Sequence, residues 1–244
     1  MTTTAILLER CAESLAKAQE HWAGQHPDTD ADAESGDVRP WTIALSREAG
    51  TPGTSIAHEV GARLNWQVYD HELVELIASE MGIRASLLES VDERHKNWLQ
   101  ESIDGICSST PSVSEGGYAR QLVETILSLG IHGRCVIVGR GASQLLSAST
   151  TLRVRLVGAL EDRIATVIKQ RGLSHEEAER WVKETDHERT HFVKTHCFKD
   201  AMELSQYDLT LSTSRWSVSE CSSFIVQALR FAESHARNRA TASK

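Results

Sequence analysis

The chain has 244 residues, 40% of them hydrophobic, and a formal net charge of −8, so it can bury the core of one sizeable domain, since single cores grow to about 200–250 residues. An acidic balance is not typical of nucleic-acid binders, and no apolar run approaches the ~20 residues that a membrane helix needs. Five scattered cysteines without a C-x-x-C pair indicate free thiols, and the first residues do not resemble a secretory signal, so we expect a cytoplasmic protein.

The N-terminal part divides into a helix and a linker. Residues 1–24 carry apolar side chains at helical spacing, which predicts an accessory amphipathic helix that packs on the main domain or mediates contact with a partner or a second copy. Residues 25–40 are acidic and poor in apolar side chains, which is typical of a flexible linker. We expect the main domain over residues 41–232 and a disordered tail over residues 233–244.

The main domain alternates short apolar runs with helical patterns, which indicates an α/β fold with a parallel central sheet flanked by helices. Strands are expected at 41–46, 67–69, 134–139, 152–158 and 208–212. Helices are expected at 53–65, 71–81, between 84 and 104, and at 118–131, 141–148, 160–171, 174–204 and 217–232. A loop is expected at 108–117, where turn-forming residues gather.

The first strand leads through a glycine-containing turn into a helix, which is the layout of a phosphate loop. Unpaired N–H groups at a helix start carry partial positive charge and favour phosphate. The candidate phosphate-binding residues are Gly50, Thr51, Gly53, Thr54 and Ser55. Thr54 stands where a Walker-type loop has its magnesium-binding hydroxyl, but the lysine of that loop is absent. The alternative interpretation is an ordinary turn between a strand and a helix.

Three arginines could meet the negative charge of a phosphoryl group. Arg47 in the turn can bind phosphate oxygens with two hydrogen bonds, or it is a surface residue paired with Glu48. Arg140 follows a strand at the end where ligands bind in parallel sheets, or it belongs to a structural turn. Asp186 and Arg189 share a helix face, which suits a common ligand or a solvated helix with ion pairs. Phosphoryl transfer needs such groups.

A competing motif overlaps this helix. His187, Glu188 and His191 match H-E-x-x-H, in which the histidines hold zinc and the glutamate activates water. The flanks are polar, and a third ligand is not evident beyond His196 or Glu203. A zinc hydrolase is therefore the remote alternative.

Several motifs, in consistent order from about residue 41 to residue 230, resemble those of the cytidylate kinase-like proteins, relatives of bacterial cytidylate kinase. They are Ile43-Ala-Leu-Ser-Arg-Glu-Ala-Gly-Thr-Pro-Gly-Thr-Ser-Ile-Ala57, Val68-Tyr-Asp-His-Glu-Leu73, Val138-Gly-Arg-Gly141, Asp186-x-x-Arg189 and Tyr207-Asp-Leu-Thr-Leu211. The resemblance implies a P-loop nucleoside-monophosphate kinase fold with a helical acceptor-binding insert and a lid. It also implies transfer of the γ-phosphoryl group of ATP to CMP or dCMP with magnesium.

The resemblance implies roles for individual residues. The loop from Gly50 to Ser55 would bind the phosphates of ATP, and Thr54 would bind Mg²⁺. The expected catalytic residues are Arg47, Arg140 and Arg189. The expected acceptor-binding residues are Asp70, Arg140, Asp186 and Arg189, and the expected lid residues are Arg163 and Lys183.

Three features depart from the kinase pattern. Gly53 stands where cytidylate kinases have the phosphate-loop lysine, and Gly141 replaces the aspartate that follows the acceptor-binding arginine. A further lid arginine of the kinases has no counterpart at its expected place, where Val182 and Lys183 stand. These departures keep open a second function, that of a catalytically weak or inactive regulatory protein that binds nucleotides.

Overall fold

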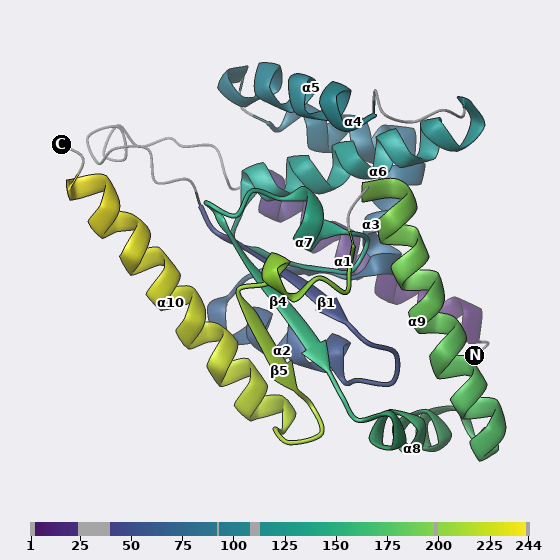
Figure 1. Ribbon diagram of the computed structural model, residues 1–244. Coiled ribbons are helices and arrows are strands. Elements are labelled where there is room, and N and C mark those ends of the chain that lie inside the picture. The colour runs from purple at the N-terminus through teal and green to yellow at the C-terminus, as the bar shows by residue number, and fades with distance from the viewer. Residues whose placement is uncertain (1–2, 24–39, 92, 108–112, 198–199, 243–244) are drawn as a thin grey trace.

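The computed structural model describes residues 3–23, 40–91, 93–107, 113–197 and 200–242 (Figure 1). The expected acidic linker lies almost entirely outside these described residues. The helices are α1 (Thr3–Ala23), α2 (Gly53–Leu64), α3 (His71–Ser79), α4 (Met81–Glu89), α5 (Glu93–Cys107), α6 (Val113–His132), α7 (Ala142–Leu145), α8 (Leu160–Arg171), α9 (His175–Cys197) and α10 (Val218–Ala242), with a short 3₁₀ helix at Leu204–Gln206. The strands are β1 (Thr42–Arg47), β2 (Gln67–Tyr69), β3 (Cys135–Val138), β4 (Thr151–Val157) and β5 (Leu209–Ser212).

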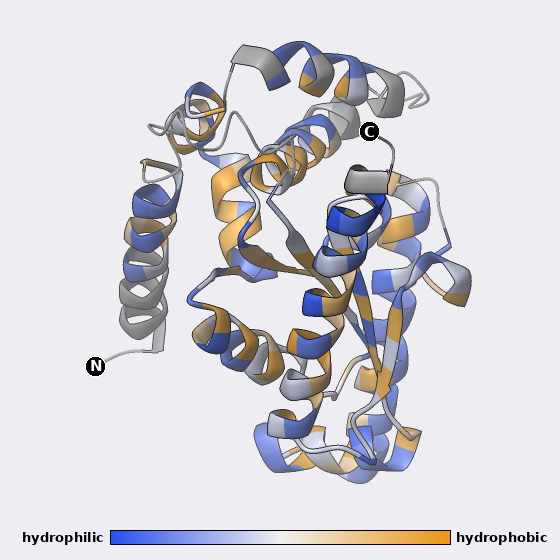
Figure 2. Cartoon of the chain, turned by 90° about the vertical axis from the view of Figure 1, so that its left-hand side faces the viewer, coloured by the Kyte–Doolittle hydropathy of each residue, from blue (hydrophilic) through white to orange (hydrophobic). Residues whose placement is uncertain are grey.

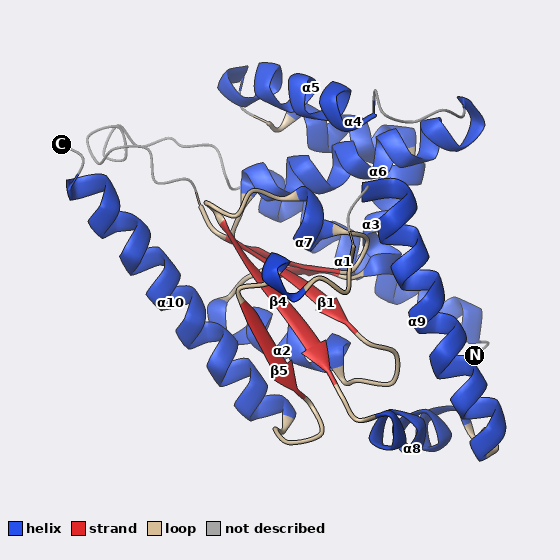
Figure 3. Cartoon of the chain, in the orientation of Figure 1, coloured by secondary structure: helices blue, strands red, loops and turns tan. Residues whose placement is uncertain are grey.

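The five strands form one sheet in the order β2-β3-β1-β4-β5, and every pair is parallel (Figure 3). All five expected strands are confirmed, with ends that differ by at most one residue. They are predictable because a parallel sheet covered on both faces needs continuous apolar strands. None of the described helices is long and apolar enough to cross a membrane.

The sheet separates two apolar cores, because side chains alternate between its faces along each strand. On β1, Ile43 and Leu45 join the core under α2 and α10, whereas Ala44 joins the core under α3 and α6. On β3, Val136 lies in the first core and Ile137 in the second. Figure 2 shows orange, apolar residues along the strands and on the helix sides that face them.

The helices between β2 and β3 form the helical insert that the sequence predicts. The region expected to be helical between residues 84 and 104 is divided between α4 and α5. The helix α6 starts at Val113, inside the region expected to be a loop, of which residues 108–112 are not described.

The N-terminal helix packs on the main domain. Ala18 and Trp22 are buried in the core that contains Tyr69. The indole Nε1 of Trp22 donates a hydrogen bond to the Tyr69 hydroxyl at 2.9 Å, and Nδ1 of His21 lies 3.0 Å from the same hydroxyl. The last turns of α1 are therefore part of the domain core.

Two helix ends differ from the sequence-based expectation. The helix α10 continues to Ala242, where a tail without regular structure is expected from residue 233. Ala232 and Ala236 are partly buried against the core under α10, so its apolar stripe continues past residue 232. The helix α9 ends at Cys197 rather than near residue 204.

Candidate active site

The loop between β1 and α2 approaches other parts of the backbone closely. Gly50 has φ +80°, and a Cβ atom there would lie 2.5 Å from the carbonyl oxygen of Arg163, so this position requires glycine. Ala49 is buried in a small apolar cluster with Ile164 and Val182 of α8 and α9. The expected phosphate loop is thus packed against the α8–α9 hairpin.

The start of α2 offers groups that fit a phosphate. Pro52 is the N-cap residue of α2, and no side-chain hydrogen bond from the described residues caps this helix end. The first N–H groups of a helix have no intrahelical partner, so those of Gly53, Thr54 and Ser55 point out of the helix end. Among the described residues, no side-chain hydrogen bond involves the half-buried Thr54 hydroxyl or the exposed Ser55 hydroxyl. These donors and the Thr54 oxygen match the chemistry of a phosphate with its magnesium ion.

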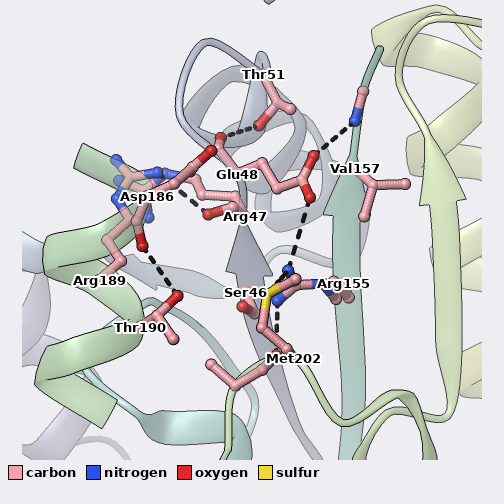
Figure 4. Close-up of polar contacts among 12 residues, drawn as sticks. Ser46, Arg47, Glu48, Thr51, Arg155, Val157, Asp186, Arg189, Thr190 and Met202 are labelled. Carbon is pink, nitrogen blue, oxygen red and sulfur yellow. Dashed lines mark hydrogen bonds and ion pairs between the residues drawn. The ribbon is translucent and has the colours of Figure 1, made fainter. Parts of the chain in front are cut away.

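Arg47 and Glu48 point in different directions from the end of β1 (Figure 4). Glu48 lies 3.7 Å from the guanidinium of Arg155 and 3.5 Å from that of Arg163, and it accepts a hydrogen bond from the Gly158 N–H at 3.0 Å. Arg47 lies 3.5 Å from Nδ1 of His71. The interpretation of Arg47 as a surface residue paired with Glu48 is therefore wrong, because alternation along the strand separates the two side chains.

Arg47 is a half-buried cation whose side chain forms no ion pair within the described part of the chain. The pKa of Arg47 is lowered to about 10, mainly by burial and also by the neighbouring Arg189 and Arg140, while Asp70 acts in the opposite direction. The guanidinium stays protonated at neutral pH. Such a group, held partly out of water among like charges, is suited to bind an anion.

Arg140 and Arg189 lie beside Arg47. The strand register pairs Leu45 with Val138, so Arg47 and Arg140 follow neighbouring strands at the same level. Arg189 donates a hydrogen bond to the Arg47 carbonyl oxygen at 3.1 Å, and burial lowers the pKa of Arg189. Arg140 pairs with Glu75 at 2.7 Å, but its buried Nε has no hydrogen-bond partner among the residues that the structure describes. The structure thus brings the three expected catalytic arginines together.

Asp186 connects α9 to the loop. Its Oδ1 accepts a hydrogen bond from the Ala49 N–H at 2.7 Å, and its Oδ2 accepts one from Arg163 at 2.5 Å. Arg163 also donates to the carbonyl oxygen of Ala49 at 3.1 Å and to that of Gly158 at 3.0 Å. In this arrangement Asp186 and Arg163 brace the expected phosphate loop.

The buried arginine Arg155 was not expected from the sequence. Arg155 of β4 donates to the Ala201 carbonyl oxygen at 2.8 Å and lies over the ring of Tyr207. Figure 4 shows its guanidinium between Glu48 and Met202. Together with Glu48 it connects the segment after α9 to the loop after β1. The sequence signal that could have found it is a charged residue between Val154 and Leu156 of a predicted strand, because a buried charge needs a partner.

The sequence pattern of the cytidylate kinase-like family matches residues 42–215. The chain belongs to the cytidylate kinase-like family. Its five-stranded parallel sheet with flanking helices is a P-loop nucleotide kinase fold, and family membership supports a nucleotide kinase-like phosphotransferase function.

Comparison with known proteins gives more distant similarities. The chain is 38% identical over 79 residues to a cytidylate kinase from Methanopyrus kandleri, which corresponds to 32% of this chain and 41% of that protein. It thus spans about two fifths of the length of this relative. A crystal structure of an uncharacterized protein from Eubacterium ventriosum superposes with a TM-score of 0.63 at 20% identity, over 78% of this chain and 98% of the other. Shikimate kinase from Bacteroides thetaiotaomicron superposes with a TM-score of 0.43 at 14% identity, over 78% and 98% of the two chains.

Other expected site residues of this cytidylate kinase-like chain have partners within the protein. The Asp70 carboxylate caps α3 by accepting a hydrogen bond from the Leu73 N–H at 2.9 Å. The Thr51 hydroxyl donates to the Glu48 carbonyl oxygen at 2.8 Å. Lys183 is exposed and pairs with Glu179 at 2.6 Å, so it does not share the contacts of Arg163.

The packing of α9 explains why the residue after Arg140 is a glycine, Gly141. Gly141 has φ +75°, and a Cβ atom there would collide with Sγ of Cys197 at the end of α9. The end of α9 therefore packs where a side chain at position 141 would lie. A zinc site receives no support, because the rings of His187 and His191 stack with centroids 6.3 Å apart and Nε2 of His191 lies 3.4 Å from the Thr195 hydroxyl. Over the described ranges, no group of three or more His, Cys, Asp or Glu side chains could hold a metal ion.

Proposed function

We propose that the protein transfers the γ-phosphoryl group of Mg-ATP to a nucleoside monophosphate, with CMP or dCMP as the acceptor. The observation that carries this proposal is the convergence of Arg47, Arg140 and Arg189 beside the start of α2. Negative charge spreads over the transferred oxygens in phosphoryl transfer, and positioned cations stabilise it. The arginines meet that requirement without a lysine in the loop.

The loop residues would bind the phosphates of ATP. The N–H groups of Gly53, Thr54 and Ser55 at the start of α2 would donate to phosphate oxygens, and the Thr54 hydroxyl would be a ligand of Mg²⁺. When bound, Mg²⁺ neutralises phosphate charge. Ala49 would not contribute its N–H, because Asp186 already accepts a hydrogen bond from it.

Arg47 would take the place of the missing lysine. Its Cβ and Cγ lie 3.1 and 3.3 Å from the position of a Cβ atom at residue 53. The arginine thus starts from the end of β1 and passes over the glycine that stands in the lysine position. Its guanidinium would bridge the transferred phosphoryl group and the acceptor phosphate.

Arg140 and Arg189 would bind the acceptor phosphate. The Nε of Arg140, which has no partner within the described part of the chain, is a buried donor that leaves hydrogen-bonding capacity for a ligand. Arg189 belongs to α9, so closure of this helix over the acceptor would couple acceptor binding to the loop through Asp186. The cytidylate kinase of Methanopyrus kandleri supports the choice of CMP as the first acceptor to test.

A second candidate function is nucleotide binding without catalysis. It is favoured by the contact of Asp186 with the Ala49 N–H, which occupies a donor of the loop, and by the absence of the loop lysine. A regulatory protein of this kind would bind Mg-ATP and would not turn it over.

The deciding experiment measures ADP release from Mg-ATP with CMP, dCMP, UMP and AMP as acceptors. We expect turnover with CMP or dCMP that falls about 10²–10³-fold in Arg140→Ala and in Arg189→Ala, as for the loss of one preorganised donor. Arg230→Ala, an exposed arginine of α10, is the matched control and retains activity. Calorimetric binding of Mg-ATP without turnover for any acceptor would favour the regulatory function.

A further inference from the structure

We propose that His71 binds the acceptor phosphate through its Nε2–H group while its Nδ1 atom orients Arg47. This inference rests on the proposed function and concerns a residue to which the family resemblance assigned no role. His71 is the first residue of α3, next to the capping residue Asp70, and its ring reaches the arginine cluster.

The contact with Arg47 determines the tautomer of the ring. The guanidinium NH2 atom of Arg47 lies 3.5 Å from Nδ1 of His71. A guanidinium can only donate hydrogen bonds, so Nδ1 must present a lone pair. A neutral imidazole with an unprotonated Nδ1 carries its proton on Nε2.

The surroundings favour a neutral ring. Arg47 approaches it from β1 and Arg140 from the turn after β3, while Asp70 and Glu72 belong to its own helix end. Burial lowers the pKa of His71, and the two arginines lower it further against the two carboxylates. A protonated ring would also lose its contact with Arg47, because Nδ1 could no longer accept.

The free side of the ring is suited to a phosphate. Among the described residues, Nε2 of His71 has no hydrogen-bond acceptor. It lies at the N-terminal end of α3, where the helix dipole favours an anion, and beside two arginines. A phosphate held there would accept one hydrogen bond from a neutral donor and others from the guanidinium groups.

Three variants of His71 distinguish the role of its Nδ1 atom from that of its Nε2 atom. Asparagine places its amide near the position of Nδ1, and glutamine places its amide near that of Nε2. In His71→Ala we expect KM for CMP to rise about tenfold while KM for Mg-ATP changes less than about twofold, since one hydrogen bond to the acceptor is lost. His71→Gln restores KM for CMP and His71→Asn does not. An unchanged KM for CMP in His71→Ala overturns the inference.

Nitrogen NMR of the imidazole tests the tautomer without any turnover. The ligand-free protein should show His71 protonated on Nε2, and addition of CMP should shift the Nε2 resonance; the signal missing in His71→Gln gives the assignment. An Nδ1–H tautomer overturns the inference alone. If the wild-type protein shows the expected tautomer but binds no acceptor, the proposed function and the phosphate contact are both contradicted. The contact between His71 and Arg47 is not contradicted by that outcome.

Discussion

The side chain of Arg47 occupies the space that any side chain at position 53 would need. A Cβ atom on Gly53 would collide with Cδ of Arg47 and would lie 3.1 Å from its Cβ. The two residues therefore form a matched pair, in which the cation comes from the end of β1 and the loop provides a glycine beneath it. Lysine at position 53 and arginine at position 47 exclude one another in this arrangement.

This exclusion predicts that the two positions are coupled. Gly53→Lys alone should displace Arg47 and lower kcat/KM for Mg-ATP about 10²–10³-fold. The double variant Arg47→Gly/Gly53→Lys, which has the residue types of a Walker-type loop at both positions, should recover about tenfold over Gly53→Lys, whereas independent effects would make it less active than either single variant. Steady-state kinetics of both single variants and the double variant measure the coupling. Additive effects in correctly folded proteins would contradict the matched-pair interpretation.

The brace between α9 and the loop predicts a loss of stability. Asp186→Ala removes the acceptor of the Ala49 N–H and the partner of Arg163, and should lower the free energy of unfolding by about 1–3 kcal/mol. Asp186→Asn keeps an acceptor oxygen and should lose less. Urea denaturation measures both values, with Glu184→Ala on the exposed face of α9 as the control, expected within about 0.5 kcal/mol of wild type. Equal stability of wild type and Asp186→Ala would show that the brace is not needed.

The packing of Cys197 against Gly141 predicts that the aspartate of the kinase pattern cannot simply be restored. Gly141→Asp introduces a side chain at φ +75° that collides with Cys197, and should lower the free energy of unfolding by about 2–4 kcal/mol. Adding Cys197→Ala should recover the part due to the collision. Urea denaturation of the single and double variants measures the recovery, and no recovery would leave backbone strain as the whole effect.

His21 predicts a dependence of stability on pH. Burial lowers its pKa below the ordinary value of 6.5, although a hydrogen bond with the backbone of Gly133 acts in the opposite direction. The unfolded state therefore binds more protons than the folded state at mildly acidic pH. The free energy of unfolding should fall as pH drops from 6.5 toward the folded-state pKa of His21, and this contribution should stay constant above pH 6.5. His71 contributes with the same sign. Denaturation at several pH values, with His21→Gln expected to reduce the slope, checks this; an identical slope would contradict it.

The sheet could be predicted from the sequence more fully than the site. Runs such as Cys135-Val-Ile-Val138 identify buried parallel strands, because a strand that is covered on both faces needs apolar side chains at every position. Arg47 and Arg140 lie together because β1 and β3 are neighbours in the sheet. The sequence indicates this grouping, because both arginines stand where predicted strands end. Partners that depend on tertiary approach, such as Glu48 with Arg155, have no local signal. The exposed position of Lys183 also depends on how α9 is rotated, which its mixed charge pattern leaves undetermined.

The proposed function depends on Arg47, which would support phosphoryl transfer in a phosphate loop without a lysine. Its most direct test is the transfer of label from γ-labelled Mg-ATP to CMP by the wild-type protein and by Arg47→Ala. We expect labelled CDP from the wild-type protein and a rate about 10²–10³-fold lower from the folded variant. Equal rates from the two proteins, or the absence of transfer to any nucleoside monophosphate by wild-type protein that binds Mg-ATP, would contradict it.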